Sequence, residues 1–198
     1  MYSLNTPKLK TDRLMLRRFT GEDLDALFLI LSDKDVNTFL QWFPLASLKE
    51  ARAFFEERYA GVYRQPVGYG YAVCLKSNNV PVGYVNVSTG DSHDLGYGFR
   101  KEFWHMGLAT EACRAIIGQV QKDGLPYITA THDRNNPRSG EEMKRLGMRY
   151  RYSYEEQWQP KNIPVTFRMY QLNFDGHSDR LYKKYWNVSP VHFIEADV

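Results

Sequence analysis

The stretch DLGYGFRKEFWHMGLATEA, residues 94–112, decides the fold. Residues 94–99 have the pattern of a short strand that contains two glycines. A turn with one further glycine, Gly107, follows. A helix is expected to begin there, because apolar residues then recur at helical spacing as far as Gly124. The segment is therefore a strand, a glycine turn and a helix in succession.

The start of this helix offers a site for an anion. Its first backbone N–H groups have no partner within the helix, and a glycine lets a phosphate group approach them closely. These groups would come from Met106, Gly107, Leu108, Ala109 and Thr110. A glycine that only turns the chain into a helix would leave the same pattern, and taken alone the segment favours that simpler interpretation.

The rest of the chain supplies six more strands and three more helices. Strands are expected over residues 13–18, 69–75, 80–88, 127–131, 149–157 and 165–172, and helices over 24–31, 47–59 and 137–146. The capping patterns Thr20-x-x-Asp23 and Ser47-x-x-Glu50 mark the first two helix starts. This order predicts an α/β (α+β) fold, in which helices cover both faces of a mixed, mostly antiparallel, twisted sheet of about seven strands.

The chain is expected to form one domain over residues 8–174, without an internal repeat or a linker. Residues 175–198 lack a clear period, yet they hold Tyr182, Tyr185, Trp186 and Phe193. We expect these residues to form an ordered C-terminal extension packed by aromatic rings, and not an independent domain.

The composition excludes several classes of protein. Two cysteines cannot form a disulfide framework, and the longest apolar run, residues 26–31, is far shorter than the roughly 20 residues of a membrane span. No apolar stretch follows the N-terminal lysines, so we expect a cytoplasmic protein that binds no membrane. A net charge of +3 does not predict nucleic-acid binding, and five scattered histidines do not predict a metal site.

Four segments resemble the general N-acetyltransferase (GNAT) superfamily, and more narrowly its branch of ribosomal-protein N-terminal acetyltransferases, the Rim-type branch. They are TDRLMLRRFTGEDLDALF (residues 11–28), DLGYGFRKEFWHMGLATEA (94–112), NNPRSGEEMKRLGM (135–148) and VTFRMYQL (165–172). The resemblance covers about residues 8–173. It implies the GNAT fold and acetyl-CoA as the cosubstrate.

The resemblance also implies where acetyl-CoA binds. The pantetheine arm would pair with backbone near Tyr97 and Phe99, in a gap between their strand and the strand at 127–131. The pyrophosphate would rest on the turn of residues 106–110. Asn136 matches the asparagine that binds pantetheine in the family.

The glycine turn departs from the family pattern. Trp104 stands where an arginine or a glutamine is common, and His105 and Met106 replace a glycine and a lysine. Backbone contacts survive such changes, because they need no particular side chain. The local loss of positive charge is expected to weaken cofactor binding.

The acid that protonates the leaving thiolate is expected on the helix that begins at residue 137. Many relatives use a tyrosine there, and the matching position is Met143. In the ribosomal-protein branch a serine takes this role, and Ser139 stands in its place, also among the expected cofactor contacts. A serine in the first turn of a helix often only bonds to the backbone, and that alternative stays open.

A carboxylate is the expected general base, because the attacking amine must lose a proton. The glutamate of the branch is matched here by Trp158. Glu156, two residues earlier, points to the same strand face. Asp94 begins the cofactor-pairing strand, where many relatives carry an acid. Each of the two also fits a surface acid, and we expect one of them to act as the base, directly or through water.

The resemblance implies that the chain transfers an acetyl group from acetyl-CoA to a primary amine by direct attack in a ternary complex. The expected acceptor is a protein N-terminus, and the expected assembly is a monomer or homodimer. Aromatic candidates for the acceptor site are Phe39, Trp42, Phe43, Tyr152, Tyr154 and Trp158, each of which is equally suited to a core. One alternative is an enzyme for a small amine such as an amino sugar, a polyamine or an antibiotic. Another is a non-catalytic acyl-CoA sensor.

Overall fold

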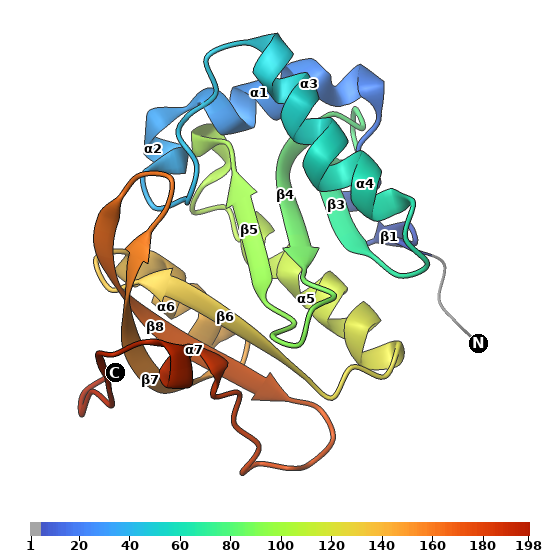
Figure 1. Cartoon of the computed structure of the whole chain (residues 1–198). Helices are drawn as coiled ribbons and strands as arrows, with labels where there is room; N and C mark the ends of the chain where they lie inside the picture. Colours follow the sequence, from blue (N-terminus) through green and yellow to red (C-terminus); the bar gives the residue numbers. More distant parts are fainter. Residues whose placement is uncertain (1–4) are drawn as a thin grey trace.

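The computed structural model describes residues 5–198 (Figure 1). Its strands are β1 (Leu9–Lys10), β2 (Leu14–Arg17), β3 (Tyr69–Leu75), β4 (Pro81–Val87), β5 (Leu95–Phe99), β6 (Tyr127–Asp133), β7 (Arg149–Trp158), β8 (Ile163–Asn173) and β9 (His192–Phe193). The α-helices are α1 (Leu24–Ser32), α2 (Lys34–Asn37), α3 (Leu48–Phe55), α4 (Gly61–Tyr63), α5 (Leu108–Lys122), α6 (Pro137–Arg145) and α7 (Lys184–Val188). Short 3-10 turns form η1 (Gly21–Asp23) and η3 (Lys101–Phe103), and a π-helical turn forms η2 (Glu56–Ala60).

The strands form two antiparallel sheets that meet at one point. Strands β1 to β5 lie side by side in chain order, and the second sheet has the order β6-β8-β7-β9. A parallel bridge between Asp94 and Thr129 joins β5 to β6, and within residues 5–198 the two strands do not pair beyond it. The expected fold class is confirmed, because the seven expected strands form mostly antiparallel pairs between helices. The sequence predicts one sheet with a gap between these two strands, and in the structure β5 and β6 diverge so far that the sheet is divided in two (Figure 1).

Strand β3 is the centre of the first sheet. Six of its seven residues are buried, as expected for a strand flanked by β2 and β4 and covered on both faces. Helix α5 covers one face, and its apolar stripe packs with residues such as Val73 and Val85. Helices α1 and α3 with the η2 turn cover the other face, where Leu27 and Tyr59 meet Ala72. Strand β5 ends this sheet, so its edge away from β4 is open, and the second sheet begins beside that edge.

Both expected helix starts carry their caps. The backbone N–H of Glu50 donates to the Ser47 hydroxyl at 3.2 Å, and the Glu50 carboxylate accepts a hydrogen bond from the backbone N–H of Ala46. From this cap, α3, η2 and α4 run on to Tyr63, past the expected end of the helix.

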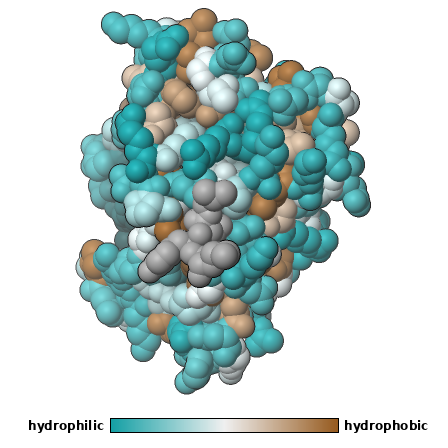
Figure 2. All heavy atoms as spheres, turned by 90° about the vertical axis from the view of Figure 1, so that its right-hand side faces the viewer, coloured by the Kyte–Doolittle hydropathy of each residue, from teal (hydrophilic) through white to brown (hydrophobic). Residues whose placement is uncertain are grey.

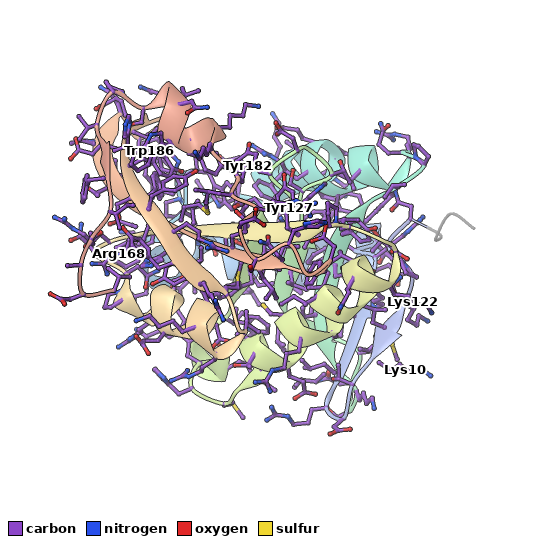
Figure 3. All side chains as sticks on the ribbon, turned by 90° about the horizontal axis from the view of Figure 1, so that it is seen from below. Lys10, Lys122, Tyr127, Arg168, Tyr182 and Trp186 are labelled. Atoms are coloured by element: carbon purple, nitrogen blue, oxygen red, sulfur yellow. The ribbon has the colours of Figure 1, made fainter. Side chains whose placement is uncertain are left out.

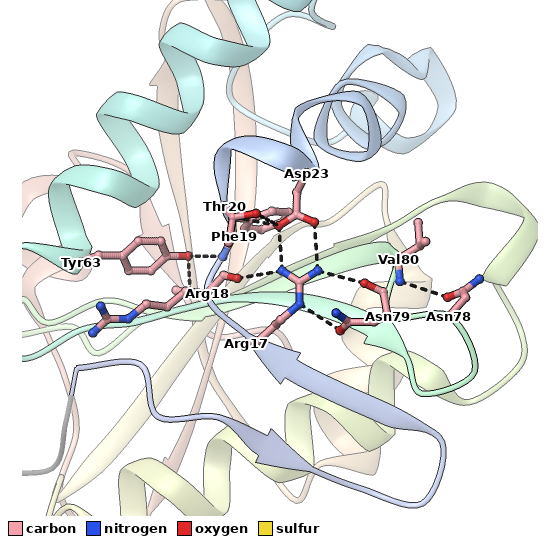
Figure 4. A network of polar contacts seen from close by, with 10 residues as sticks. Arg17, Arg18, Phe19, Thr20, Asp23, Tyr63, Asn78, Asn79 and Val80 are labelled. Carbon is pink, nitrogen blue, oxygen red and sulfur yellow. Dashed lines mark hydrogen bonds and ion pairs between the residues drawn. The ribbon is translucent and has the colours of Figure 1, made fainter.

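The other cap, at η1, belongs to a polar network that ties the first helix to the sheet (Figure 4). The guanidinium of Arg17 donates to both carboxylate oxygens of Asp23, at 2.7 and 2.9 Å, and also to Asn79 in the β3–β4 turn. Burial alone would raise the pKa of Asp23. Hydrogen bonds from Arg17 and Thr20 outweigh this effect and lower the pKa. The buried carboxylate therefore stays charged and fixes α1 against β2.

The C-terminal extension, residues 175–198, packs against the second sheet. Strand β9 pairs with β7, and Tyr182, Tyr185 and Trp186 join a cluster with residues of β7 and β8. Among the helices of residues 5–198, none combines the length and apolar character that a membrane crossing requires. On the side of the N-terminus, the surface is mostly hydrophilic (Figure 2).

Candidate active site

The edge of β5 that faces β6 is open. At the end of the β4–β5 ladder the N–H of Arg100 donates to the carbonyl of Val82 at 2.9 Å. Because hydrogen-bonded pairs alternate along an antiparallel ladder, Tyr97 and Phe99 direct their backbone N–H and C=O groups away from β4. These groups face the gap between β5 and β6, so an extended ligand that carries amide groups can pair with them.

A cleft of about 1300 Å³ follows this gap from the start of α5 to the loop after α2. It exceeds the usual size of a pocket for a small molecule. Of the expected cofactor contacts, Tyr97, Phe99, Gly107, Leu108, Ala109, Thr110, Asn136 and Ser139 line it. The cleft therefore suits a long, flexible ligand better than a compact one.

The start of α5 has the geometry of an anion site. Gly107 is the N-cap residue, its φ of 72° is in the left-handed region that glycine tolerates, and no side chain caps the helix. The N–H groups of Leu108, Ala109 and Thr110 therefore have no partner within the helix. They border the cleft, as the sequence predicts.

Two side-chain interactions of Arg13, which lies between β1 and β2, hold the turn before α5 in place. Arg13 Nη1 donates to the carbonyl of Met106 at 2.8 Å, and Arg13 Nε pairs with Glu111 of α5 at 2.7 Å. The Met106 side chain is 52% exposed and does not line the cleft. The hydrogen bond from Arg13 thus fixes Met106 through its backbone carbonyl.

Trp104 has a structural role in this turn. Its indole Nε1 donates to the carbonyl of Phe99 at 2.8 Å, and its ring packs against the main core. This contact occupies one lone pair of Phe99, while the backbone of Tyr97 keeps its free donor and acceptor. Trp104 therefore lacks the positive charge of an arginine, but its hydrogen bond and packing fix the conformation of the turn.

Helix α6 borders the cleft opposite β5. Asn136 is its N-cap residue, and the Ser139 hydroxyl lies 3.2 Å from the hydroxyl of Tyr97. The side chain of Ser139 thus has a partner in the cleft. Burial raises the pKa of Tyr97, so this phenol keeps its proton. Met143 is 1% exposed and part of the core.

Asp94 lies at the closed end of the gap, where β5 and β6 are still bridged. Its carboxyl oxygen Oδ1 is 3.1 Å from the Thr129 hydroxyl, which also lies 2.9 Å from the carbonyl of Ser92. Burial raises the pKa of Asp94 to about 7, against the lowering effect of the Thr129 hydrogen bond. A carboxyl with this pKa can both take up and release a proton near neutral pH.

Glu156, the other expected base, is exposed on β7 and does not line the cleft. Partial burial also raises the pKa of Glu156, but of the two carboxyls Asp94 is the one that lines the cleft.

The expected acceptor aromatics separate into two groups. Phe39, Trp42 and Trp158 line the cleft. Phe43 is 58% exposed and lies outside it, while Tyr152 and Tyr154 are buried against the C-terminal extension. Among the lining residues that the sequence analysis missed are Tyr84, Asn86 and Phe167.

Two buried polar atoms at the cleft have no partner among the described residues. They are Oε1 of Glu142 and Nε2 of His132. Glu142 lies one turn after Ser139 and lines the cleft, as does His132. A carboxylate oxygen without a partner can accept a hydrogen bond from a ligand N–H group, so these residues fit a ligand with amide groups.

Comparison with known proteins shows which family the chain resembles. Residues 13–149 match the family model of the acetyltransferase (GNAT) domain. The N-acetyltransferase YoaA of Bacillus subtilis, described as uncharacterized, is 22% identical over 171 residues, which cover 84% of this chain and 96% of YoaA.

Solved structures share the fold. An acetyltransferase (GNAT family) from Bacillus anthracis is 22% identical with a TM-score of 0.74, and the match covers 85% of this chain and 99% of that one. RimL, a ribosomal L7/L12 α-N-protein acetyltransferase in complex with coenzyme A, is 16% identical with a TM-score of 0.73 and the same coverage. Because the family model spans more than half of the chain, the chain belongs to the GNAT acetyltransferases, enzymes that transfer an acetyl group from acetyl-CoA to an amine.

Proposed function

We propose that the chain acetylates the α-amino group of a protein or peptide N-terminus, by direct attack of the amine in a ternary complex with acetyl-CoA. The observation that carries the proposal is the Asp94 carboxyl in the cleft, with a pKa of about 7. An α-ammonium group has a pKa of about 7.7–8.0, whereas a lysine ε-ammonium has one of about 10.4. Asp94 therefore matches the first acceptor far better than the second.

The cleft has separate groups for each part of the cosubstrate. The N–H groups of Leu108, Ala109 and Thr110 bind the pyrophosphate, and the backbone of Tyr97 pairs with the pantetheine arm. Asn136, at the start of α6, binds the same arm. Acetyl-CoA supplies the acetyl group as a thioester, which is activated toward attack by an amine.

Different residues carry out the two proton transfers. Asp94 accepts the proton of the attacking amine. Ser139 donates a proton to the leaving thiolate and regains one from water, while Asp94 releases its proton to water; the protonated Tyr97 phenol, 3.2 Å from Ser139, supports the donor. Every residue assigned here belongs to one chain, so the proposal needs no partner subunit and applies to a monomer or a homodimer. A nascent-protein acceptor would place the reaction in the cytoplasm.

The name of one structural relative gives independent support, because RimL is described as a ribosomal α-N-protein acetyltransferase. Its identity to this chain is 16%, so the acceptor itself has to be tested.

The test is thiol release from acetyl-CoA with mass-spectrometric detection of the acetylated product. The panel contains peptides with free N-termini, the same peptides with a blocked N-terminus and an internal lysine, amino sugars and polyamines. We expect acetylation of free N-termini and little of lysine. Turnover of small amines alone would replace the proposal by the small-molecule alternative. Tight binding of coenzyme A without turnover of any amine would point to a sensor.

A further inference from the structure

We propose that the C-terminal extension, residues 175–198, backs one wall of the active site, and that Tyr185 of α7 holds water away from the carboxyl of Asp94. In this role Tyr185 is a positioning residue, since it acts through Asp94. The inference rests on the proposed function of Asp94 as general base.

The extension is anchored on the loop that leads into Asp94. The hydroxyl of Tyr182 donates to Asp91 Oδ1 at 3.2 Å, and Lys184 Nζ lies 3.5 Å from Asp91 Oδ2. From β6, the hydroxyl of Tyr127 donates to the carbonyl of Asp91 at 2.5 Å. Tyr127 and Tyr182 lie beside each other in Figure 3, with ring centroids 6.3 Å apart. Asp91 is thus held by side chains from two elements, three residues before Asp94.

A column of aromatic rings connects the extension to the cleft. The ring of Tyr185 stacks on Tyr154 of β7 with centroids 5.1 Å apart and an interplanar angle of 11°. Tyr154 stacks in turn on Phe167 of β8 at 5.5 Å. Phe167 lines the cleft, so Tyr154 and Tyr185 form the layer behind this wall.

The charge of Asp94 acts on both tyrosines of the column. Its negative charge raises the pKa of Tyr154 and of Tyr185, after the larger effect of burial. Ser92, two residues before Asp94, also interacts with the Tyr185 side chain. The carboxyl therefore borders the cleft, and its charge reaches rings supplied by β7 and α7.

The pKa of Asp94 depends on the groups that surround its carboxyl. Thr129 of β6 donates a hydrogen bond to the carboxyl, and the charge of the carboxyl reaches the uncharged phenols of Tyr154 on β7 and Tyr185 on α7. Glu156, also on β7, is a second acid near Tyr154. The effects on the Asp94 carboxyl are burial, which raises its pKa, and the weaker Thr129 hydrogen bond, which lowers it. Burial depends on what covers the carboxyl, and part of that cover belongs to the extension.

The far end of the extension is also fixed, which holds α7 in place. Glu195 pairs with Arg168 of β8, where Arg168 Nε lies 3.0 Å from Glu195 Oε1, and it accepts a hydrogen bond from Ser153 of β7. Strand β9 pairs with Ser153 and Tyr154. Helix α7 therefore lies between two anchored ends of the extension.

The test compares Tyr185→Ala with Tyr185→Phe, which keeps the ring. The ionisation of Asp94 is followed by carboxyl ¹³C NMR over pH 3–9, with Asp94→Asn to assign the signal. We expect a midpoint near pH 7 in the wild type and in Tyr185→Phe. In Tyr185→Ala, water reaches the carboxylate, and the midpoint should fall by at least one pH unit, a tenfold increase in acidity. If Tyr185→Ala does not fold, Tyr185→Gln introduces a hydrated amide of similar length at the same place.

An unchanged midpoint in a folded Tyr185→Ala or Tyr185→Gln protein would overturn the inference. The pH profile of kcat/KM provides the second readout, and its acid limb should move with the NMR midpoint, which a purely structural role would not cause. The two proposals fail separately. If Asp94→Asn leaves the acid limb in place, Asp94 is not the base, while the NMR titration still decides whether Tyr185 covers its carboxyl.

Discussion

Replacement of Asp94 by asparagine is expected to remove activity and to stabilise the fold at alkaline pH. Burial raises the pKa of this carboxyl from its ordinary value near 4 to about 7, so the folded state binds the proton more tightly than the unfolded chain. The resulting stabilisation is complete below about pH 4 and is lost as the pH rises from about 4 to about 7. Asparagine has nearly the same shape and no proton to lose, so the variant keeps its stability over this range.

The expected magnitude follows from the pKa difference. A difference of about three pH units corresponds to about 4 kcal/mol between the protonated and the fully ionised state. About a third of this is already lost at pH 5, so the advantage of the variant should grow by roughly 2–3 kcal/mol between pH 5 and pH 8. For a chain of this size, that is a relative rise in Tm of roughly 5–10 °C.

The assay is urea denaturation of the wild type and Asp94→Asn at pH 5, 6, 7 and 8. Glu156→Gln is the matched control, because its carboxyl is exposed and its stability difference should depend far less on pH. In parallel, kcat/KM should fall about 10²–10⁴-fold in Asp94→Asn and lose its acid limb near pH 7. A stability difference that is the same at every pH would show that the carboxyl is hydrated and refute the reasoning. Loss of the acid limb in Glu156→Gln instead would identify Glu156 as the base.

Two further substitutions test the cofactor side of the cleft. Arg13→Ala removes the hydrogen bond to Met106 and the ion pair with Glu111, so KM for acetyl-CoA should rise about 5–10-fold in steady-state kinetics, while the loss of this half-exposed pair lowers stability by at most ~1 kcal/mol. An unchanged KM would mean that the turn keeps its shape without Arg13. Ser139→Ala should lower kcat by about 10–100-fold with little change in KM, and Tyr97→Phe should lower it less, because Ser139 is the proposed donor and Tyr97 only supports it. If kcat stays at the wild-type value in Ser139→Ala, another group protonates the thiolate.

The cofactor side could be predicted from the sequence because its determinants are local. Gly107, the apolar stripe of α5 and the N-cap Asn136 lie within a few residues of the groups they position. The same holds for the Ser47 cap of α3. In each of these cases a short pattern specifies a backbone conformation, and the backbone supplies the binding groups.

The base and acceptor side could be predicted only in part, because its environment comes from distant residues. Asp94 was one of two equal candidates in the sequence, and its carboxyl is distinguished by Thr129 and by rings of the extension, some 90 residues away. The extension also explains why Tyr152 and Tyr154 do not line the cleft. They have the composition of an acceptor pocket, but pack instead against Trp186 and Tyr185.

The burial of Asp94 makes its carboxylate a stronger base, and it lowers the stability of the fold when the carboxyl is ionised. Proton transfer from an α-ammonium group of pKa near 8 to an ordinary carboxylate of pKa near 4 is uphill by a factor of about 10⁴. With a carboxylate of pKa about 7 the factor is only about 10, an improvement of about 10³. The folded chain gives up about the same free energy, ~4 kcal/mol, when it holds the ionised carboxyl in the cleft at pH 8. Contacts outside the cleft have to supply this stability, and the ring column and the Glu195–Arg168 pair of the extension are among them.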